Sequence, residues 1–286
     1  MELAAGKTLE ALGHLCLQFR GDLDGAADAL RESLDIQRRH LDPADPDIAE
    51  IEFRLALVAA RQGRLEEALG LLQESLESKR AYYGRHPEVA RVLINIAHTM
   101  WWQGEDGGEP YAREAVEIVT EKLKQDHPLA GVAHHIHAGP LQSEGRLDEA
   151  EAALNEALAI WERLGDRSFR RAGTLRRLAW LHIQQGDFGL AEALVDESLG
   201  IYKEEKSFES PESVFAKAIK GACLAARRDP AAESTLRAAF EILAQAGAAN
   251  DRFEWATAEW LVDLYETLGE ADKAAPFRAV LAERPS

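Results

Sequence analysis

Residues 63–68, Gly63-Arg64-Leu65-Glu66-Glu67-Ala68, are one copy of a short motif that recurs along this chain. The motif is a glycine, a polar residue and an apolar residue, followed after two variable positions by alanine. Other copies begin at Gly21, Gly145, Gly186 and Gly269, and degenerate copies begin at Gly104 and Arg228. Successive copies begin 41 or 42 residues apart. This constant spacing predicts a repeat architecture.

A second series, a small residue followed by an apolar one, recurs in phase with the first. Its members are Ser33-Leu34, Ser75-Leu76, Ala115-Val116, Ala157-Leu158, Ser198-Leu199 and Ala239-Phe240. Small side chains at these positions would let two helix backbones approach closely, while larger apolar residues fill the space between neighbours. Two series in phase indicate that one structural unit is repeated over nearly the whole chain.

Each repeat is predicted to be a pair of helices. Apolar residues recur with helical spacing on both sides of the motif glycine, as in Leu175, Leu178, Ala179 and Ile183, and in Leu147, Ala150, Leu154 and Leu158. The glycine supplies the positive φ that ends the first helix. Helix starts are indicated where proline follows a polar residue, at Asp45-Pro46, His86-Pro87, His127-Pro128 and Ser210-Pro211.

One helix pair cannot bury its apolar faces alone, so the pairs must stack. We therefore predict an all-α fold, a right-handed superhelical solenoid of about seven stacked antiparallel helix hairpins. It would form a single array over residues 1–286. The repeats are expected at about 2–41, 46–84, 87–125, 128–165, 168–206, 211–247 and 251–285.

One repeat resembles a known family. The stretch Tyr83-Gly84-Arg85-His86-Pro87-Glu88-Val89-Ala90, with Leu93-Ile94-Asn95-Ile96-Ala97 and Gln103-Gly104, is similar to the long tetratricopeptide repeat of the kinesin light chain type. The resemblance implies a scaffold that binds proteins or peptides. Bacteria use such arrays as standalone adaptors, or as sensor regions of kinases and NTPase-type regulators.

The composition narrows the functional classes. The 286 residues carry a formal charge of −17, and 46% of them are hydrophobic, so we expect a folded, soluble chain. Such acidity argues against bulk nucleic acid and anionic membrane surfaces as partners. We find no signal peptide and no membrane-length apolar run, and expect a cytoplasmic protein. The only cysteines, Cys16 and Cys223, are interpreted as buried small hydrophobes.

Catalytic and metal motifs are weak. Gly6-Lys7-Thr8 lacks the earlier glycine and the strand of a P-loop. His134, His135 and His137, with His98 one repeat earlier, do not have the i, i+4 spacing of a helical metal site. We favour the interpretation that a groove histidine among them donates a hydrogen bond to a ligand. We therefore predict no enzyme activity, no metal and no cofactor.

The dipeptide Gly139-Pro140 lies inside a predicted helix. Proline lacks the donor for the carbonyl of Ile136, and glycine before proline is pushed out of the α region. We expect a kink or a break. Two interpretations are open. The irregularity is simply tolerated, or it forms a pocket beside His135 in which the freed Ile136 carbonyl contacts a ligand.

The family resemblance implies that the first helix of each hairpin lines a concave groove. Ligand-facing positions would lie 13, 10, 9, 6, 3 and 2 residues before each motif glycine, on one face of the helix. In repeats 2 to 5 these positions hold five arginines against one glutamate, with two histidines and three tryptophans. Repeat 6 is apolar there and repeat 7 is acidic. The predicted peptide-binding residues are Arg54, Arg61, Arg91, Asn95, His98, Trp101, His135, Arg176, Arg177, Trp180 and Gln184.

Arginine favours carboxylate and phosphate groups, and tryptophan offers a desolvated anchor. Asn95 matches the family's backbone-binding asparagine, which most other repeats replace, so a charge-selective site is favoured. Trp101 and Trp102 are adjacent, so at least one is expected in the core. The leading hypothesis is a non-enzymatic scaffold or adaptor for an acidic or carboxylate-bearing peptide. Alternatives are a sensor for a small molecule or signal peptide, part of a larger kinase or NTPase-type regulator, or a self-assembly module that forms homodimers through its terminal repeats.

Overall fold

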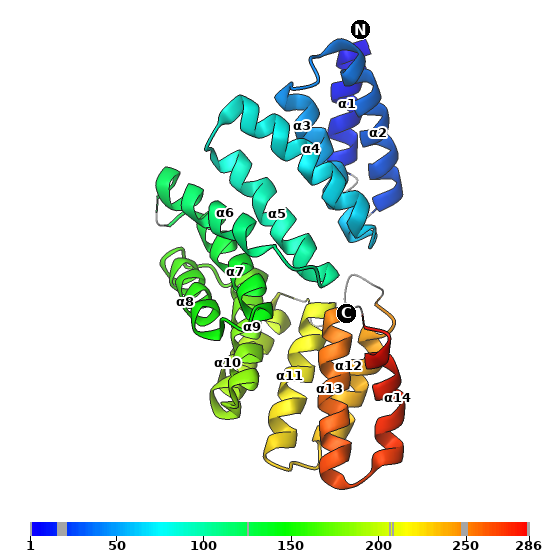
Figure 1. Ribbon diagram of the computed structural model, residues 1–286, viewed down its shortest axis with the longest axis vertical. Helices are drawn as coiled ribbons and strands as arrows, with labels where there is room; N and C mark the ends of the chain where they lie inside the picture. The colour runs from blue at the N-terminus through cyan, green and yellow to red at the C-terminus, as the bar shows by residue number, and fades with distance from the viewer. Residues whose placement is uncertain are drawn as a thin grey trace. The chain divides into compact units, whose positions relative to one another are not determined.

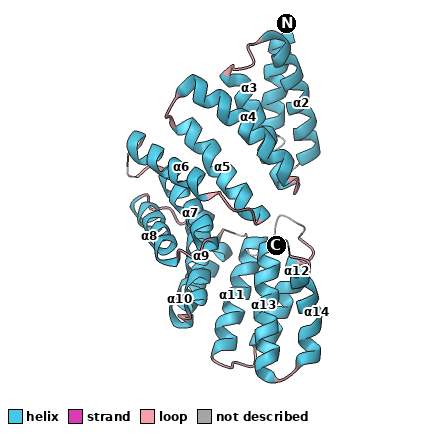
Figure 2. Cartoon of the chain, in the orientation of Figure 1, coloured by secondary structure: helices cyan, strands magenta, loops and turns pink. Residues whose placement is uncertain are grey.

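The computed structural model describes residues 2–15, 22–124, 126–205, 207, 209–246 and 251–284. Gly21 and Cys16, which the sequence interpretation used, lie outside these ranges. Within them the chain is helical, its helices joined by loops and turns, and it has no β-strand (Figures 1 and 2). The helices are α1 (Glu2–Leu15), α2 (Leu23–His40), α3 (Pro46–Arg61), α4 (Leu65–Tyr83), α5 (Pro87–Gln103), α6 (Glu109–Lys122), α7 (Pro128–Ser143), α8 (Leu147–Arg163), α9 (Phe169–Gln185), α10 (Phe188–Glu204), α11 (Pro211–Ala226), α12 (Ala232–Leu243), α13 (Asp251–Leu268) and α14 (Ala271–Ala282).

The helices pack as hairpins in chain order, from α1 with α2 to α13 with α14. The hairpins group into two compact units, residues 1–125 with α1 to α6 and residues 126–286 with α7 to α14. Within each unit consecutive hairpins stack, and in the second unit α9 also contacts α11, and α11 contacts α13. The predicted all-α solenoid of helix hairpins is confirmed in the described part of the chain. That both units form a single array stays a prediction.

The motif positions are left-handed turns, as the spacing predicted. The glycines have φ between +73° and +82°, at Gly63, Gly104, Gly145, Gly186 and Gly269. Arg228, the degenerate copy, has φ +60° and is the one described residue other than glycine with positive φ. The repeat therefore imposes this turn even where the residue disfavours it.

The predicted helix starts are also confirmed. Asp45 accepts a hydrogen bond from the Asp47 amide at 2.9 Å, with Pro46 at the first helical position. The ring nitrogen of His86 accepts from the Glu88 amide at 3.2 Å in the same way. His127 and Ser210 cap α7 and α11. A side-chain acceptor satisfies an amide that has no partner within the helix, while proline costs nothing there.

The second series joins the two helices of a hairpin. Ser75 donates its hydroxyl hydrogen to the Ala49 carbonyl at 2.7 Å, and Ser198 donates to the Ala172 carbonyl at 2.8 Å. Ser33 bonds to the Gly6 carbonyl in the same manner. The alanine members are buried, namely Ala115, Ala157 and Ala239. Small residues on both helices permit this approach.

The helix break allowed for at Gly139-Pro140 does not occur. α7 runs without interruption from Pro128 to Ser143, and both residues are buried within it. The Pro140 carbonyl accepts a hydrogen bond from the Glu144 amide at 3.0 Å, so the turn after the proline is intact. Proline removes a single donor from the ladder, and the remaining bonds and the packing hold the helix. A kink without a break, and a role for it, stay predictions.

Candidate functional site

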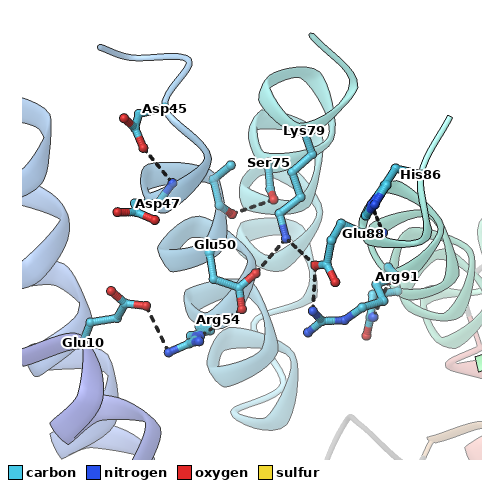
Figure 3. A network of polar contacts seen from close by, with 12 residues as sticks. Glu10, Asp45, Asp47, Glu50, Arg54, Ser75, Lys79, His86, Glu88 and Arg91 are labelled. Carbon is cyan, nitrogen blue, oxygen red and sulfur yellow. Dashed lines mark hydrogen bonds and ion pairs between the residues drawn. The ribbon is translucent and has the colours of Figure 1, made fainter. Parts of the chain in front are cut away.

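Arg54, the first predicted binding residue of the first unit, is held by two carboxylates. Its Nε donates to Glu50 at 3.0 Å, and its Nη1 lies 3.1 Å from the Glu10 carboxylate (Figure 3). Glu10 comes from α1, whereas Arg54 and Glu50 are one turn apart on α3. The guanidinium is thus shared between two helices.

The same network continues to α5. Lys79 of α4 is buried, and its Nζ lies 2.7 Å from Glu50 and 3.4 Å from Glu88 (Figure 3). Arg91 donates to Glu88 at 2.7 Å. Lys79 and Arg91 each lie 4.9 Å from the centre of the buried Phe53 ring. We call these six charged residues, Glu10, Glu50, Arg54, Lys79, Glu88 and Arg91, the ionic network.

The ionic network contains three acids and three bases. Burial raises the pKa of Glu50, but hydrogen bonds from Lys79 and Arg54 and the charges of Lys79 and Arg91 outweigh it, so the pKa lies below its usual value. Arg54 and Arg91 therefore neutralise acids of the protein itself. A basic surface was predicted for repeats 2 and 3. At Arg54 and Arg91 the positive charge is balanced by glutamates of the protein itself. Arg61 is exposed at the end of α3, with no carboxylate of the described residues within 4 Å.

The polar and aromatic residues of α5 are engaged with their own helix. The Asn95 amide donates to the Arg91 carbonyl at 2.8 Å. Trp102 donates its ring N–H to Nε2 of His98 at 2.8 Å. Trp101 is only 3% exposed, and Trp102 is the more accessible of the two. Trp101 therefore belongs to the core rather than to a ligand surface, because adjacent helical residues point in different directions.

The predicted arginines of the second unit have a different environment. Arg176 and Arg177 on α9 are 6% and 4% exposed. Arg177 donates from Nη1 to the backbone carbonyl of His135 on α7 at 3.2 Å. The Arg176 guanidinium lies over two buried rings, 4.6 Å from the centre of Phe253 and 5.6 Å from that of Phe215. Two neighbouring cations are thus buried against carbonyl and aromatic groups.

Arg252 at the start of α13 completes this cluster. Its Nη1 donates to the Ser143 hydroxyl at 3.4 Å. Burial, followed by the charges of Arg176 and Arg252, lowers the pKa of Arg177 to about 9, which leaves it protonated at neutral pH. Nε of Arg176 is buried without a hydrogen-bond partner, and no carboxylate of the described residues lies within 4 Å of Arg176. We call Arg176, Arg177 and Arg252 the arginine cluster.

His135 connects α7 to α9 beside the cluster. Its Nδ1 lies 3.1 Å from Oγ1 of Thr174, which donates its own hydrogen to the Arg170 carbonyl and accepts from Trp161. With that hydrogen committed, Nδ1 of His135 must be the donor to Thr174. The contact between His135 and Thr174 therefore joins α7 to α9, and hydrogen bonding of His135 to a ligand stays a prediction.

The remaining predicted residues lie on α9. The Gln184 side-chain carbonyl accepts from the Gln142 amide of α7 at 2.7 Å. Trp180 is half-buried and meets Phe215 edge to face, with ring centres 5.0 Å apart. Phe215 in turn stacks on the half-buried Trp260 of α13 at 5.6 Å. Aromatic side chains from α9, α11 and α13 thus adjoin the arginine cluster.

Sequence reasoning missed Arg252. It lies 17 residues before Gly269, outside the positions that the family analogy assigns to the ligand face. Its contact with Ser143 joins residues 109 apart in the sequence, so no local spacing could have indicated it.

The described ranges also lack the features of two other classes of protein, metal-binding proteins and membrane-spanning proteins. No group of three or more histidine, cysteine, aspartate or glutamate side chains there could hold a metal ion. No described helix is both long and apolar enough to cross a membrane. Cys223 is buried, and burial raises its pKa to about 11, which disfavours the reactive thiolate.

Comparisons with known proteins concern the repeats and the fold. The tetratricopeptide repeat family model matches residues 47–106 and 130–204. A Rap protein complexed with Competence and Sporulation Factor has a TM-score of 0.75 at 15% identity, over 99% of this chain and 75% of that one. Aspartyl phosphate phosphatase F from Bacillus subtilis gives 0.70 at 14%, over 100% and 71%. The apo quorum sensor NprR from B. thuringiensis gives 0.64 at 15%, over 96% and 74%. No curated protein matches. At these identities the likeness is one of fold.

Proposed function

Because the tetratricopeptide repeat family model matches residues 47–106 and 130–204 of this chain, we propose that the protein is a non-enzymatic interaction scaffold of that repeat type that binds an acidic or carboxylate-bearing peptide segment. The arginine cluster of the second unit is the observation that supports the proposal. It gathers three guanidinium groups, two of them buried, and no described carboxylate lies within 4 Å of Arg176.

The physical reason is the cost of buried charge. Cations taken out of water are expensive unless an opposite charge compensates them. A ligand carboxylate would supply that charge and form short, charge-assisted hydrogen bonds with the planar guanidinium groups. In the ionic network of the first unit, acids of the protein already fill this role. Because Arg176 has no carboxylate of the described residues within 4 Å, we propose that the anionic group of the ligand binds in the second unit at Arg176, beside Arg177, Trp180 and Arg252.

The similar structures agree with a scaffold or sensor. One of them holds Competence and Sporulation Factor and another is a quorum sensor. A third is an aspartyl phosphate phosphatase, which makes hydrolysis the relevant enzymatic alternative. We expect no phosphate release when the full chain is incubated with acetyl phosphate; catalytic release above the buffer control would contradict the non-enzymatic proposal.

Fluorescence polarisation tests binding directly. Acidic, neutral and basic labelled peptides of equal length are titrated with the full chain and with Arg177→Met. We expect the acidic peptides to bind most tightly and Arg177→Met to weaken them at least tenfold. Arg163→Met is the matched control, because Arg163 is an exposed arginine of the same unit paired with Asp126 at 2.9 Å. Equal affinity for all three peptides would refute the proposal.

The sensor alternative is favoured by the burial of Nε of Arg176, since an enclosed donor suits a small anion. Thermal-shift measurements with anionic metabolites test it: stabilisation by a metabolite, with no binding of any acidic peptide, would replace the scaffold by a sensor.

We also propose a cytoplasmic location and no nucleic-acid or membrane partner, because the chain carries a formal charge of −17. Homodimerisation through the terminal repeats is a further proposal. Light scattering over a wide concentration range tests it, and a constant monomer mass would exclude it.

A further inference from the structure

The three acids at the predicted ligand-facing positions of repeat 7 are not equivalent. Glu259, Asp263 and Glu266 lie on one side of α13, because they are three or four positions apart. Glu259 lies 2.9 Å from Arg284, and Glu266 lies 2.7 Å from Arg278, so both are paired with bases of the C-terminal part of the chain. Asp263 has neither a hydrogen bond nor an ion pair with a described residue. Of these three acids, Asp263 is therefore the one whose charge is not balanced within the described ranges.

The surroundings of Asp263 disfavour its negative charge. Its side chain is exposed, so a ligand can reach it, although neighbouring atoms shield part of it from water. This shielding raises the pKa of Asp263, and the charge of Glu266 raises it further. The adjacent helix α11 packs against α13, and its ligand-facing positions there are uncharged, Ala218, Ile219 and Ala222 among them. A cation supplied by a ligand would therefore be attracted to this carboxylate.

An aromatic ring lies one helical turn from Asp263. Trp260 precedes it by three residues on α13, a spacing that makes two side chains neighbours on the helix surface. The Trp260 ring stacks on the buried Phe215 ring of α11, with ring centres 5.6 Å apart and planes 13° from parallel. Trp260 is half-buried, so part of its side chain is accessible to a ligand. A tryptophan ring attracts ammonium and guanidinium groups electrostatically, so it would add to the attraction of the carboxylate.

The Phe215 ring also adjoins the proposed anion site. The Arg176 guanidinium lies 5.6 Å from the centre of the Phe215 ring, as does the centre of the Trp260 ring. Twice this distance, about 11 Å, is the greatest separation that Arg176 and Trp260 can have. An extended peptide advances about 3.3 Å per residue, so two or three residues cover most of this distance. One short peptide segment can therefore contact both places.

We propose that Trp260 and Asp263 bind a cationic side chain, an ammonium or guanidinium group, of the peptide whose carboxylate binds at Arg176. The ligand then carries both charges within a few residues of each other. Arginine of repeat 5 and aspartate of repeat 7 recognise opposite charges of one segment, which fixes the direction in which that segment lies. This inference rests on the proposed function, since it adds a second charged group to the peptide that the scaffold binds.

Isothermal titration of the full chain with peptides of equal length tests the cation site. Each peptide has one central glutamate, and the residues two positions before and after it are lysine, arginine, glutamine or glutamate. We expect the lysine and arginine peptides to bind at least fivefold more tightly than the glutamine peptide, because only their side chains carry a cation. The lysine and arginine arms show which cation is preferred.

Variants separate the cation site from the general negative charge of the chain. Asp263→Asn is expected to remove most of the advantage of the lysine peptide and to leave the glutamine peptide unchanged. Glu259→Gln is the matched control, because it removes a charge from the same helix at an acid already paired with Arg284, and we expect less than a twofold change. Trp260→Leu should weaken the lysine peptide at least threefold more than the glutamine peptide.

Charge reversal gives a second test of the same site. Asp263→Lys is expected to bind the peptide with flanking glutamates more tightly than the lysine peptide, the opposite of the wild-type preference. Circular dichroism confirms that each variant is folded. An unchanged preference in folded Asp263→Lys would refute the site.

The outcomes separate this inference from the proposed function. If the lysine, arginine and glutamine peptides bind equally, the inference is wrong and the scaffold for a carboxylate-bearing peptide stands. If Asp263→Asn and Glu259→Gln weaken the lysine peptide equally, the preference reflects net charge alone, and the inference is again wrong. If no peptide binds, the inference and the proposed function are both wrong.

Discussion

Replacing Arg177 by methionine should make the protein more stable while it removes binding. Burial, and then the charges of Arg176 and Arg252, lower the pKa of Arg177 from its usual value to about 9. At about 1.4 kcal/mol per tenfold change in proton affinity, keeping this group charged costs the folded state roughly 5 kcal/mol. Methionine fills a similar volume without charge, but it loses the hydrogen bond to the His135 carbonyl, which contributes about 1 kcal/mol.

The expected change in the free energy of unfolding is smaller than this cost of keeping Arg177 charged. Relaxation around a buried charge recovers part of it, and apolar replacement of buried charges commonly stabilises proteins by about 1–4 kcal/mol. We therefore expect Arg177→Met to raise the free energy of unfolding by about 1–3 kcal/mol. Proteins commonly lose some stability where a site must keep groups that are needed for function. A stabilising Arg177→Met that also loses binding would be an example.

The dependence on pH has a definite sign. Arg177 is charged in both states below pH 9, so its destabilising effect is fully present at neutral pH. Because the pKa is about 9 in the folded state and higher in the unfolded state, the unfolded state binds more protons between these values. The wild type should therefore gain stability relative to Arg177→Met as pH rises above 9.

Urea unfolding followed by far-ultraviolet circular dichroism measures the effect at pH 7 and pH 10. Arg54→Met is the matched control, because Arg54 is compensated by Glu50 and Glu10. Removing Arg54 leaves Glu10 without this partner, while Glu50 keeps Lys79 at 2.7 Å, and we expect the free energy of unfolding to fall by about 1–2 kcal/mol. If Arg177→Met destabilises the protein as Arg54→Met does, the burial of the charged Arg177 has no net cost for the folded state, and the reasoning fails.

Four further substitutions are expected to change stability. Arg228→Gly should raise the free energy of unfolding by about 0.5–1 kcal/mol, because relief of a left-handed conformation outweighs the added entropy of the unfolded chain. Gly186→Ala, where an added Cβ meets nothing within 4 Å, should lower it by about 1 kcal/mol in the same urea assay; equal signs for both variants would contradict the turn argument. Gly131→Ala should destabilise by more than about 1 kcal/mol and change the near-ultraviolet dichroism, since its Cβ would lie 2.6 Å from the Trp161 ring; unchanged stability would show that this ring moves freely. The pKa of Glu50 is lowered in the folded state, so its contribution is present above its ordinary pKa of 4.5 and is lost as pH falls below it. Glu50→Gln should therefore flatten the acid limb of the stability profile, and an unaltered limb would exclude this role.

The repeat series predicted the fold in detail because its signals are local. A left-handed turn needs glycine, and a helix start favours an acceptor before proline. Each of these preferences can be recognised within a few residues of sequence. The constant spacing of the motif then assigned even Arg228 to a turn. The helix break considered at Gly139-Pro140 does not occur, because that expectation used a local rule alone. Proline is disfavoured inside a helix, but packing within the second unit keeps α7 continuous.

The candidate site was predicted less completely. Helical position selected Arg54, Arg91, Arg176 and Arg177 as candidates, but it could not indicate which of them have acidic partners. Glu10 reaches Arg54 across 44 positions of sequence, and Arg252 joins the cluster from another hairpin. Trp101 and Trp102 could be separated only by the packing of α5, which buries the first of them.

By itself, the sequence determined that this chain is a series of helix hairpins closed by left-handed turns, because backbone conformation depends on neighbouring residues. Only the tertiary structure decided where charge is compensated. Electrostatic compensation depends on distance in space, and the contacts that set it join separate helices. The same residue type is therefore a paired structural ion at Arg54 and, in our proposal, an anion-binding group at Arg177.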